Sequence, residues 1–501
     1  MALTDKGDMA YLPQEIFQMI IQHLQPVDLV RCRGVSSAWY RAFTNPVNLA
    51  QVLKDKFSRA KEVRELFSQT KGPTPYESLY TEFSNKWRAI FDIVTERYYR
   101  LEHGIPRSIQ RFDLQRETLR GGYQFFGVRP WDHHSSHSGH RIDMLFSHAF
   151  WTYEDCLVVY PDKHEQSLIL LDVETEEQFM VPFVLTDKVI RRLRLHDRLL
   201  VIEWVESEPF HWLNDRDRVH RHYATSFEVN AVGRGWDIVL RNELKIMFLG
   251  HPLGDRDRFY SCHTRNHYAI YVWQPNRSLY TADEDAPIES LSIYDISTAS
   301  EYKPSQDPTG RSIDSGPRQV ASFAFRELQF YSVRQRGFPA IMRMDLDSQS
   351  NSISITEVRD TGRVDFNVLE HSPCVQVVTI PFIGQGPALQ RKVTTYYPPY
   401  RGNCSMEIAP WTVTRPWACY WAICESTDEE AHVSFCLSYF SSKAQVGFEI
   451  DPLMLTIHTP QSIKTLSIEL SKNVAFKGKI CGDERFVVGE NDSNQLVIMK
   501  F

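Results

Sequence analysis

The sequence lacks an excess of basic residues and any long apolar run, and each absence argues against a class of protein. Its 63 acidic residues outnumber its 56 lysines and arginines, for a formal net charge of −7, whereas nucleic-acid-binding domains usually present a basic surface. No apolar run approaches the ~18 residues of a membrane helix. Residues 1–10 are polar, without the apolar segment of a secretory signal. We therefore expect no nucleic-acid partner, no membrane contact, and a cytoplasmic and/or nuclear location.

The cysteines show no framework pattern. There are nine of them, an odd number without regular spacing, which favours reduced thiols over a set of disulfides. The chain of 501 residues is long enough to bury a large apolar core, and its length suggests two or three structural units.

Recognisable catalytic and metal-binding signatures are also missing. Four histidines lie within residues 132–140, but no cysteine or carboxylate stands at a zinc spacing around them, so a polar loop is the simpler interpretation. Cys419, Cys424, His432 and Cys436 resemble a zinc set in spacing only. Their neighbours are typical of strands, where cysteine is a small core residue. We expect no metal, no cofactor and no catalytic residue.

The first hundred residues are patterned for helices. Pro26 restarts the chain after a first helix, and Ser36 is a good N-cap for a third. In the first helix, apolar residues recur at three- and four-residue steps: Ile16, Met19, Ile20 and Leu24. A longer apolar stripe runs from Leu79 to Leu101 and predicts one helix of some seven turns. We expect this long helix to join the first helices to the rest of the chain.

After residue 106 the pattern changes to short β-type runs separated by turns. The clearest runs are residues 156–160, 167–173, 199–204, 268–273, 291–296 and 486–489. Many short strands with few helical signals predict an all-β architecture. The remaining ~390 residues are too many for one sandwich, which favours a β-propeller of six or seven blades. A weak repeat, Asp-Arg-Asp-Arg at 215–218 and again at 255–258, has the length of one blade.

One set of spaced residues near the N-terminus is far more specific. It combines Leu-Pro at 12–13, Asp-Leu at 28–29 and Val-Ser-x-x-Trp at 35–39. Together with apolar residues at helical spacing between them, this pattern resembles the F-box family over residues 10–50. Cys32 stands where the family usually has an aliphatic residue. The chain also resembles F-box proteins of filamentous fungi with a divergent β-rich C-terminal half, and beyond residue 110 this resemblance is one of texture only.

The resemblance implies a partner and a role. F-box proteins bind a Skp-family adaptor and, through it, the cullin of an SCF-type E3 ubiquitin ligase. The chain would then be a non-catalytic substrate-recognition subunit. The residues expected to face the adaptor are Leu12, Pro13, Ile16, Ile20, Leu24, Leu29, Val35 and Trp39. For Ile20, Leu24 and Phe43, a place in the private core of the helices is an equally good interpretation.

These observations predict an α+β multidomain protein. The expected units are an F-box at 8–50, a helical linker at 51–109 and a β-rich, propeller-like substrate-recognition domain at 110–501. The substrate and the residues that bind it are not indicated. Two alternatives stay open: an F-box protein that acts outside the ligase as a structural or regulatory adaptor, and a propeller enzyme with an added F-box. The second would need acids, bases or metal ligands converging at one end of the β domain.

Overall fold

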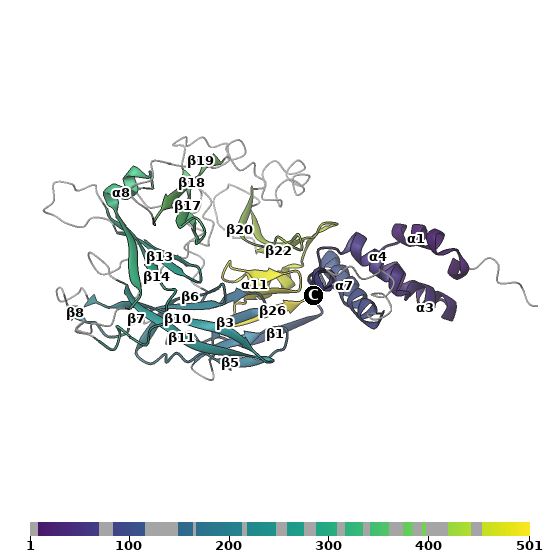
Figure 1. Ribbon diagram of the computed structural model, residues 1–501, viewed down its shortest axis with the longest axis horizontal. Helices are drawn as coiled ribbons and strands as arrows, with labels where there is room; N and C mark the ends of the chain where they lie inside the picture. The colour runs from purple at the N-terminus through teal and green to yellow at the C-terminus, as the bar shows by residue number, and fades with distance from the viewer. Residues whose placement is uncertain are drawn as a thin grey trace, which may run out of the picture.

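The structure of the protein is a computed structural model. It describes residues 9–69, 84–115, 149–163, 167–212, 218–246, 258–274, 287–307, 316–333, 341–359, 374–383, 393–396, 419–441 and 453–501. The chain begins in a helical arm and continues into a region of antiparallel sheets (Figure 1). The arm and the outermost sheet elements, such as β8, lie at opposite ends of the molecule's long axis.

Three short helices follow a 3-10 turn, η1 (Met9–Tyr11): α1 (Gln14–His23), α2 (Pro26–Cys32) and α3 (Ser37–Phe43). Pro26 occupies the first turn of α2, where its missing N–H has no helical partner to lose. Ser36 caps α3, because its side-chain oxygen accepts a hydrogen bond from the Trp39 amide at 3.1 Å. Both expected helix starts are confirmed.

Among the described residues, the arm also contains α4 (Pro46–Lys56), α5 (Lys61–Gln69) and α7 (Ser84–His103). The apolar stripe of α7 is buried at Trp87, Phe91, Val94 and Leu101, as its spacing predicts, while the expected start of the stripe at Leu79 lies outside the described residues. The helix ends at Gly104, whose positive φ of 65° suits glycine. No described helix combines the length and apolarity needed to span a membrane.

The β-rich region forms several four-stranded antiparallel sheets, of which the described residues contain six. The first three run β2-β3-β4-β5, β6-β7-β10-β11 and β12-β13-β14-β15. Their strands are β2 (Thr152–Glu154), β3 (Leu157–Pro161), β4 (Leu168–Asp172), β5 (Gln178–Met180), β6 (Lys188–His196), β7 (Leu199–Glu206), β10 (His222–Val232), β11 (Gly235–Ile246), β12 (Arg258–His263), β13 (His267–Gln274), β14 (Ile288–Asp295) and β15 (Arg318–Ala324). A hairpin of β8 (His211–Trp212) and β9 (Arg218–Val219) is inserted between β7 and β10.

The other three sheets run β16-β17-β18-β19, β20-β21-β22-β23 and β24-β25-β26-β1. Their strands are β16 (Ile341–Asp347), β17 (Ser352–Arg359), β18 (Cys374–Pro381), β19 (Val393–Tyr396), β20 (Cys419–Asp428), β21 (Val433–Ser441), β22 (Met454–His458), β23 (Ile463–Thr465), β24 (Cys481–Asp483), β25 (Phe486–Glu490), β26 (Gln495–Lys500) and β1 (Ser108–Asp113). In the described part of this region, the short helices α8 (Phe325–Phe330) and α11 (Ile468–Ala475) follow β15 and β23.

One sheet joins the two ends of the β-rich region. Strand β1 leaves the helical arm and pairs antiparallel with β26, with Ser108 opposite Lys500 and Asp113 opposite Gln495. The arm is therefore attached to the same sheet that contains the last strand of the chain. That sheet can form only after the whole β-rich region has been synthesised.

The expected strands are confirmed, with small shifts at some of their ends. All six predicted runs lie on strands, β3, β4, β7, β13, β14 and β25. Cys156, however, is a turn residue with φ of 65°, because Asp155 and Cys156 form the two-residue connection between β2 and β3. Most of the Asp-Arg-Asp-Arg tracts and the whole histidine cluster at 132–140 lie outside the described residues.

A single apolar core links the arm to the sheets. It contains Phe17 and Leu29 from the first helices, Phe91 from α7, and Phe435 and Val497 from the last two sheets. The expected boundaries near residues 50 and 109 therefore fall inside one continuously packed cluster. Burying apolar surface on both sides of these boundaries stabilises the arm and the sheets together.

Candidate functional site

Helix α1 carries more apolar surface than its own core can cover. At about 100° per residue, its apolar positions span an arc of about 200°, twice the width usual for a helix that packs with one face. Half of this arc, with Phe17 and Ile21, is buried at 3% and 2% exposure. The other half, with Ile16 and Met19, is exposed at 45% and 61%.

Further apolar side chains are exposed outside α1. Leu12 and Pro13, just before the helix, are exposed, and η1 contacts α3. Val35, in the turn before α3, is 62% exposed. We call Leu12, Ile16, Met19 and Val35 the apolar surface of the first helices. Exposed aliphatic side chains on neighbouring elements are typical of a surface that binds another protein.

The structure separates the other predicted adaptor-facing residues into two groups. Ile20, Leu24 and Trp39 are half-buried, and the last two pack against the core; the Trp39 ring stacks on Phe43 with ring centroids 5.4 Å apart. Leu29 is only 2% exposed. Its side chain has almost no surface left for a partner, so Leu29 holds the helices together and we leave it out of the proposed contact surface.

Some exposed large hydrophobic residues of this region are not among the predicted contacts, and Met19 and Tyr11 are the most exposed of them, at 61% and 59%. The sequence pattern assigns Met19 only to the helical repeat and gives Tyr11 no role. For Met19 the signal was present in the sequence. It lies three residues after Ile16 and four before His23, on the side of α1 opposite to Phe17 and Ile21.

Polar contacts fix the first helices on α7. The guanidinium of Arg33 pairs with Asp92, and the guanidinium of Arg88 lies over the Tyr40 ring at 5.2 Å from its centroid. Burial, followed by the charge of Asp28, raises the pKa of the Cys32 thiol, so this thiol stays neutral and acts as a small apolar residue. The apolar surface is therefore presented on a fixed support.

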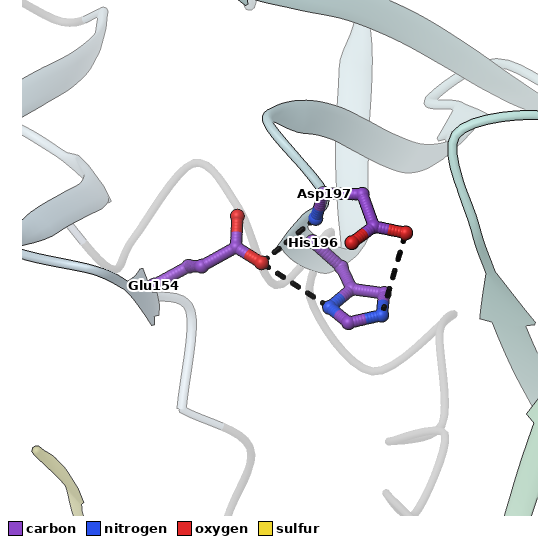
Figure 2. Close-up of side chains that lie close together, drawn as sticks. All are labelled: Glu154, His196 and Asp197. Carbon is purple, nitrogen blue, oxygen red and sulfur yellow. Dashed lines mark hydrogen bonds and ion pairs between the residues drawn. The ribbon is translucent and has the colours of Figure 1, made fainter. Parts of the chain in front are cut away.

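A second candidate site lies in the β-rich region, where Glu154, His196 and Asp197 come together (Figure 2). It is the only group of three possible metal ligands among the described residues. Glu154 Oε1 lies 3.2 Å from His196 Nδ1, and Asp197 Oδ2 lies 3.9 Å from His196 Nε2. The two carboxylates thus approach opposite nitrogens of one ring, which does not converge on a single ion.

The hydrogen bonds of Glu154 explain this cluster without a metal. Asp197 and Arg198 form the tight turn between β6 and β7, with positive φ values of 53° and 57°. Glu154 accepts hydrogen bonds from both turn amides, at 2.7 and 3.1 Å. Burial acts to raise the pKa of Glu154, but the His196 contact and then the two turn amides lower it below its ordinary value. The residues therefore join two neighbouring sheets and do not fit a metal site.

A third polar cluster centres on Glu203, which is 3% exposed. Its carboxylate accepts hydrogen bonds from Ser261 Oγ and, at 3.1 Å, from Tyr268 Oη, and Arg192 binds the same Ser261 hydroxyl at 3.0 Å. Burial raises the pKa of Glu203. The cluster connects the β6–β11 sheet to the β12–β15 sheet, and its burial leaves no room for a substrate.

The cysteines that resembled a zinc set lie on strands. Cys419 and Cys424 belong to β20 and Cys436 to β21, while His432 lies in the turn between them. Cys436 is fully buried, and burial beside strand neighbours is the ordinary environment of a structural cysteine. Sequence neighbours thus predicted the local structure of this segment correctly.

Comparison with known proteins identifies the first helices. Residues 9–51 match the family model described as F-box-like. The chain matches none of the curated proteins with which it was compared.

Several solved structures are similar to the chain at low identity. A chain of the "Crystal Structure of Mitotic Checkpoint Complex" is 5% identical with a TM-score of 0.33, covering 80% of this chain and 96% of that one. The Pyrococcus horikoshii acylaminoacyl peptidase is 10% identical with a TM-score of 0.25, covering 62% of this chain and 43% of that one. A chain of the "Crystal structure of Nidogen/Laminin Complex" is 10% identical with a TM-score of 0.21, covering 65% and 86%.

Proposed function

We propose that this chain, whose residues 9–51 are an F-box-like domain, is the substrate-recognition subunit of an SCF-type E3 ubiquitin ligase. The apolar surface of the first helices binds a Skp-family adaptor and, through it, the cullin. The β-rich region binds a protein substrate. The protein acts in the cytoplasm, the nucleus or both.

One observation carries the proposal. The first helices bury Phe17, Ile21 and Leu29 in their own core and still expose Ile16 and Val35, at 45% and 62%. A helical unit that needed these side chains only for its own stability would enclose them. Covering them with a partner removes apolar surface from water, which is the main source of affinity in helix-in-groove recognition.

We infer that the six sheets are the blades of a β-propeller. The first strands of consecutive sheets contact one another in the pairs β2 with β6, β12 with β16, and β20 with β24. Contact between β2 and β24 brings the sheet at the end of the chain beside the sheet at its beginning. Pairing of β1 with β26 would then close the ring within one blade.

The proposed contribution to catalysis is positional. An F-box subunit holds a substrate near a charged ubiquitin-conjugating enzyme, which raises the effective concentration of a substrate lysine at the thioester. Such a role requires no acid, base or nucleophile in this chain. The polar clusters around Glu154 and Glu203 are accounted for by contacts between sheets, so they give no support to an enzymatic alternative.

Affinity capture of the whole chain tests the proposal. We expect a Skp-family adaptor and a cullin to be recovered with the wild-type protein, and neither with the double variant Ile16→Asp, Val35→Asp. Recovery of the adaptor without the cullin would favour the alternative of an F-box protein acting outside the ligase. Full recovery of the adaptor with the double variant would refute the proposed surface.

A further inference from the structure

The helical arm is seated on the ends of three sheets by a network of charged residues. At the start of α5, Lys61 Nζ lies 3.6 Å from Asp155 in the β2–β3 turn. One turn later, Arg64 pairs with Glu430 in the β20–β21 turn. The third contact is made by Glu484, in the turn between β24 and β25. The arm therefore rests where the first sheet and the last two sheets meet.

Glu484 is the centre of this network. It is 1% exposed, and its carboxylate accepts three hydrogen bonds from the arm. The donors are the Lys61 amide at 2.7 Å, the Tyr98 hydroxyl at 2.8 Å and the Arg97 guanidinium at 3.3 Å. Because the Lys61 amide is the first of helix α5, Glu484 acts as an N-terminal cap supplied by a distant part of the chain.

Arg97 connects Glu484 to a second carboxylate. Its guanidinium, 6% exposed, also forms a two-pronged pair with Glu62 of α5, with one contact at 2.9 Å. Burial disfavours the charge of Glu62, yet the Arg97 contacts lower the pKa of Glu62 below its ordinary value. Burial likewise opposes the charge of Arg97, and its bonds to Glu62 raise its pKa. Burial raises the pKa of Glu484 above its ordinary value, although the charge of Arg97 and the Lys61 amide act in the opposite direction. Glu62 and Arg97 are thus held as a charged pair, and Glu484 is held by its three hydrogen bonds.

Apolar packing at the junction supplies attraction between the arm and the sheets, whereas the triad of Glu62, Arg97 and Glu484 fixes their relative direction. Phe57, Tyr98 and Leu466 belong to the apolar core around the junction, and such packing is attractive but non-directional. The planar fork of Arg97 accepts only a narrow range of carboxylate directions. A buried ion triad adds little net stability but can select one arrangement among several that pack equally well.

We propose that Glu484, Arg97 and Glu62 are positioning residues that set the angle of the F-box arm relative to the β-rich region. This inference rests on the proposed function, in which the arm carries the adaptor and the sheets carry the substrate. The triad then determines how far the bound substrate lies from the conjugating enzyme. It acts through geometry and touches neither partner.

Single-molecule energy transfer on the full-length chain tests this role. Dyes are attached to unnatural amino acids at Gln22 on α1 and Gln178 on β5, both exposed, because nine native cysteines rule out selective thiol labelling. The uncharged triple variant Glu62→Gln, Arg97→Met, Glu484→Gln keeps the size of each side chain. We expect a wild-type distribution with one narrow peak and at least a twofold broader or clearly displaced one in the variant. Its thermal midpoint should change little.

Two single variants complete the test, one as a control on the same helix and one that separates the charge of Arg97 from its planar shape. Arg100→Met removes the exposed Arg100–Glu96 pair on the same helix and should leave the distribution unchanged. Arg97→Lys keeps the charge without the fork and should broaden the distribution even if the triple variant fails to fold. An unchanged distribution in Arg97→Lys, or in a folded triple variant, would overturn the positioning role. Adaptor binding, measured separately on the same proteins, reports on the proposed function alone.

Discussion

Replacing Val35 by aspartate gives the sharpest test of the adaptor surface. Val35 is 62% exposed, so a partner that covers it removes more than half of the side chain from water. Full burial of a Val, Leu or Ile side chain is worth about 1.5–3 kcal/mol, which leaves about 1–2 kcal/mol for this contact. Losing that alone weakens binding by roughly five- to thirtyfold.

The aspartate adds a second penalty. A carboxylate forced into an apolar contact must lose its water, at an effective cost of several kcal/mol. We therefore expect Val35→Asp to raise the Kd for a purified Skp-family adaptor by at least about a hundredfold. Exposed substitutions away from special features usually change stability by less than about 0.5 kcal/mol, so the thermal midpoint should be almost unchanged.

The measurement is isothermal titration of the adaptor into each variant. Val232 provides a matched control, because it is the same residue type at 60% exposure and lies at the end of β10, outside the F-box-like domain. Val232→Asp should bind as the wild type does. Wild-type affinity in Val35→Asp, with a folded protein, would show that the partner does not cover this surface.

Four other substitutions test the packing and the charges of the fold, one in the first helices and three in the β-rich region. Leu29→Ala should lower the free energy of unfolding by about 2–5 kcal/mol, because Leu29 is 2% exposed; a variant that keeps its denaturation midpoint and loses only adaptor binding would contradict this. Glu484→Ala leaves the Lys61 amide, the Tyr98 hydroxyl and part of the Arg97 guanidinium without their acceptor, and should lower the free energy of unfolding by about 3 kcal/mol or more. Urea denaturation measures this change, and a loss below about 1 kcal/mol would contradict the network. Gly489→Ala would place a Cβ 2.3 Å from the Val474 carbonyl oxygen and should destabilise the fold by at least about 1–3 kcal/mol, so an unchanged melting temperature would refute that packing. Burial lowers the pKa of His222 well below its ordinary value, so below pH ~6.5 the folded state binds fewer protons than the unfolded state and the free energy of unfolding falls as the pH drops. His222→Gln should reduce the slope of the free energy of unfolding against pH by up to about 1.4 kcal/mol per pH unit. Identical slopes in the wild type and the variant would exclude this role of His222.

The helices and strands were largely predictable because their signals are local. Ser36 and Pro26 indicated helix starts through backbone hydrogen bonding within a few residues. The β-type runs at 199–204 and 268–273 correspond to β7 and β13, since fully buried strands are continuous apolar runs. The apolar run predicts Cys156 in a strand, whereas the residue lies in the turn before β3. The sequence gives no sign of this turn, because turns with positive φ are usually marked by Gly or Asn and this one contains neither.

The candidate site was predictable only in part. The F-box pattern identified the correct helices, but a helical period shows which residues share a face and not which face is covered. Leu29 and Val35 are both aliphatic residues of the F-box pattern, yet one is buried and the other exposed. Which of them is buried depends on α4 and α7, which pack against the first helices from later in the chain.

By itself, the sequence determined the first helices, the long helix α7 and the clearest strands, the existence of an F-box-like domain and the surplus of apolar residues in α1, because each depends on residues close together in the chain. Only the tertiary structure decided that β1 pairs with β26 and that one core joins the arm to the last two sheets. It also decided that Glu484 accepts hydrogen bonds from the Lys61 amide and the Arg97 guanidinium. These contacts join residues nearly four hundred positions apart (387 between Arg97 and Glu484), and no local pattern specifies which distant partner will cover a given side chain.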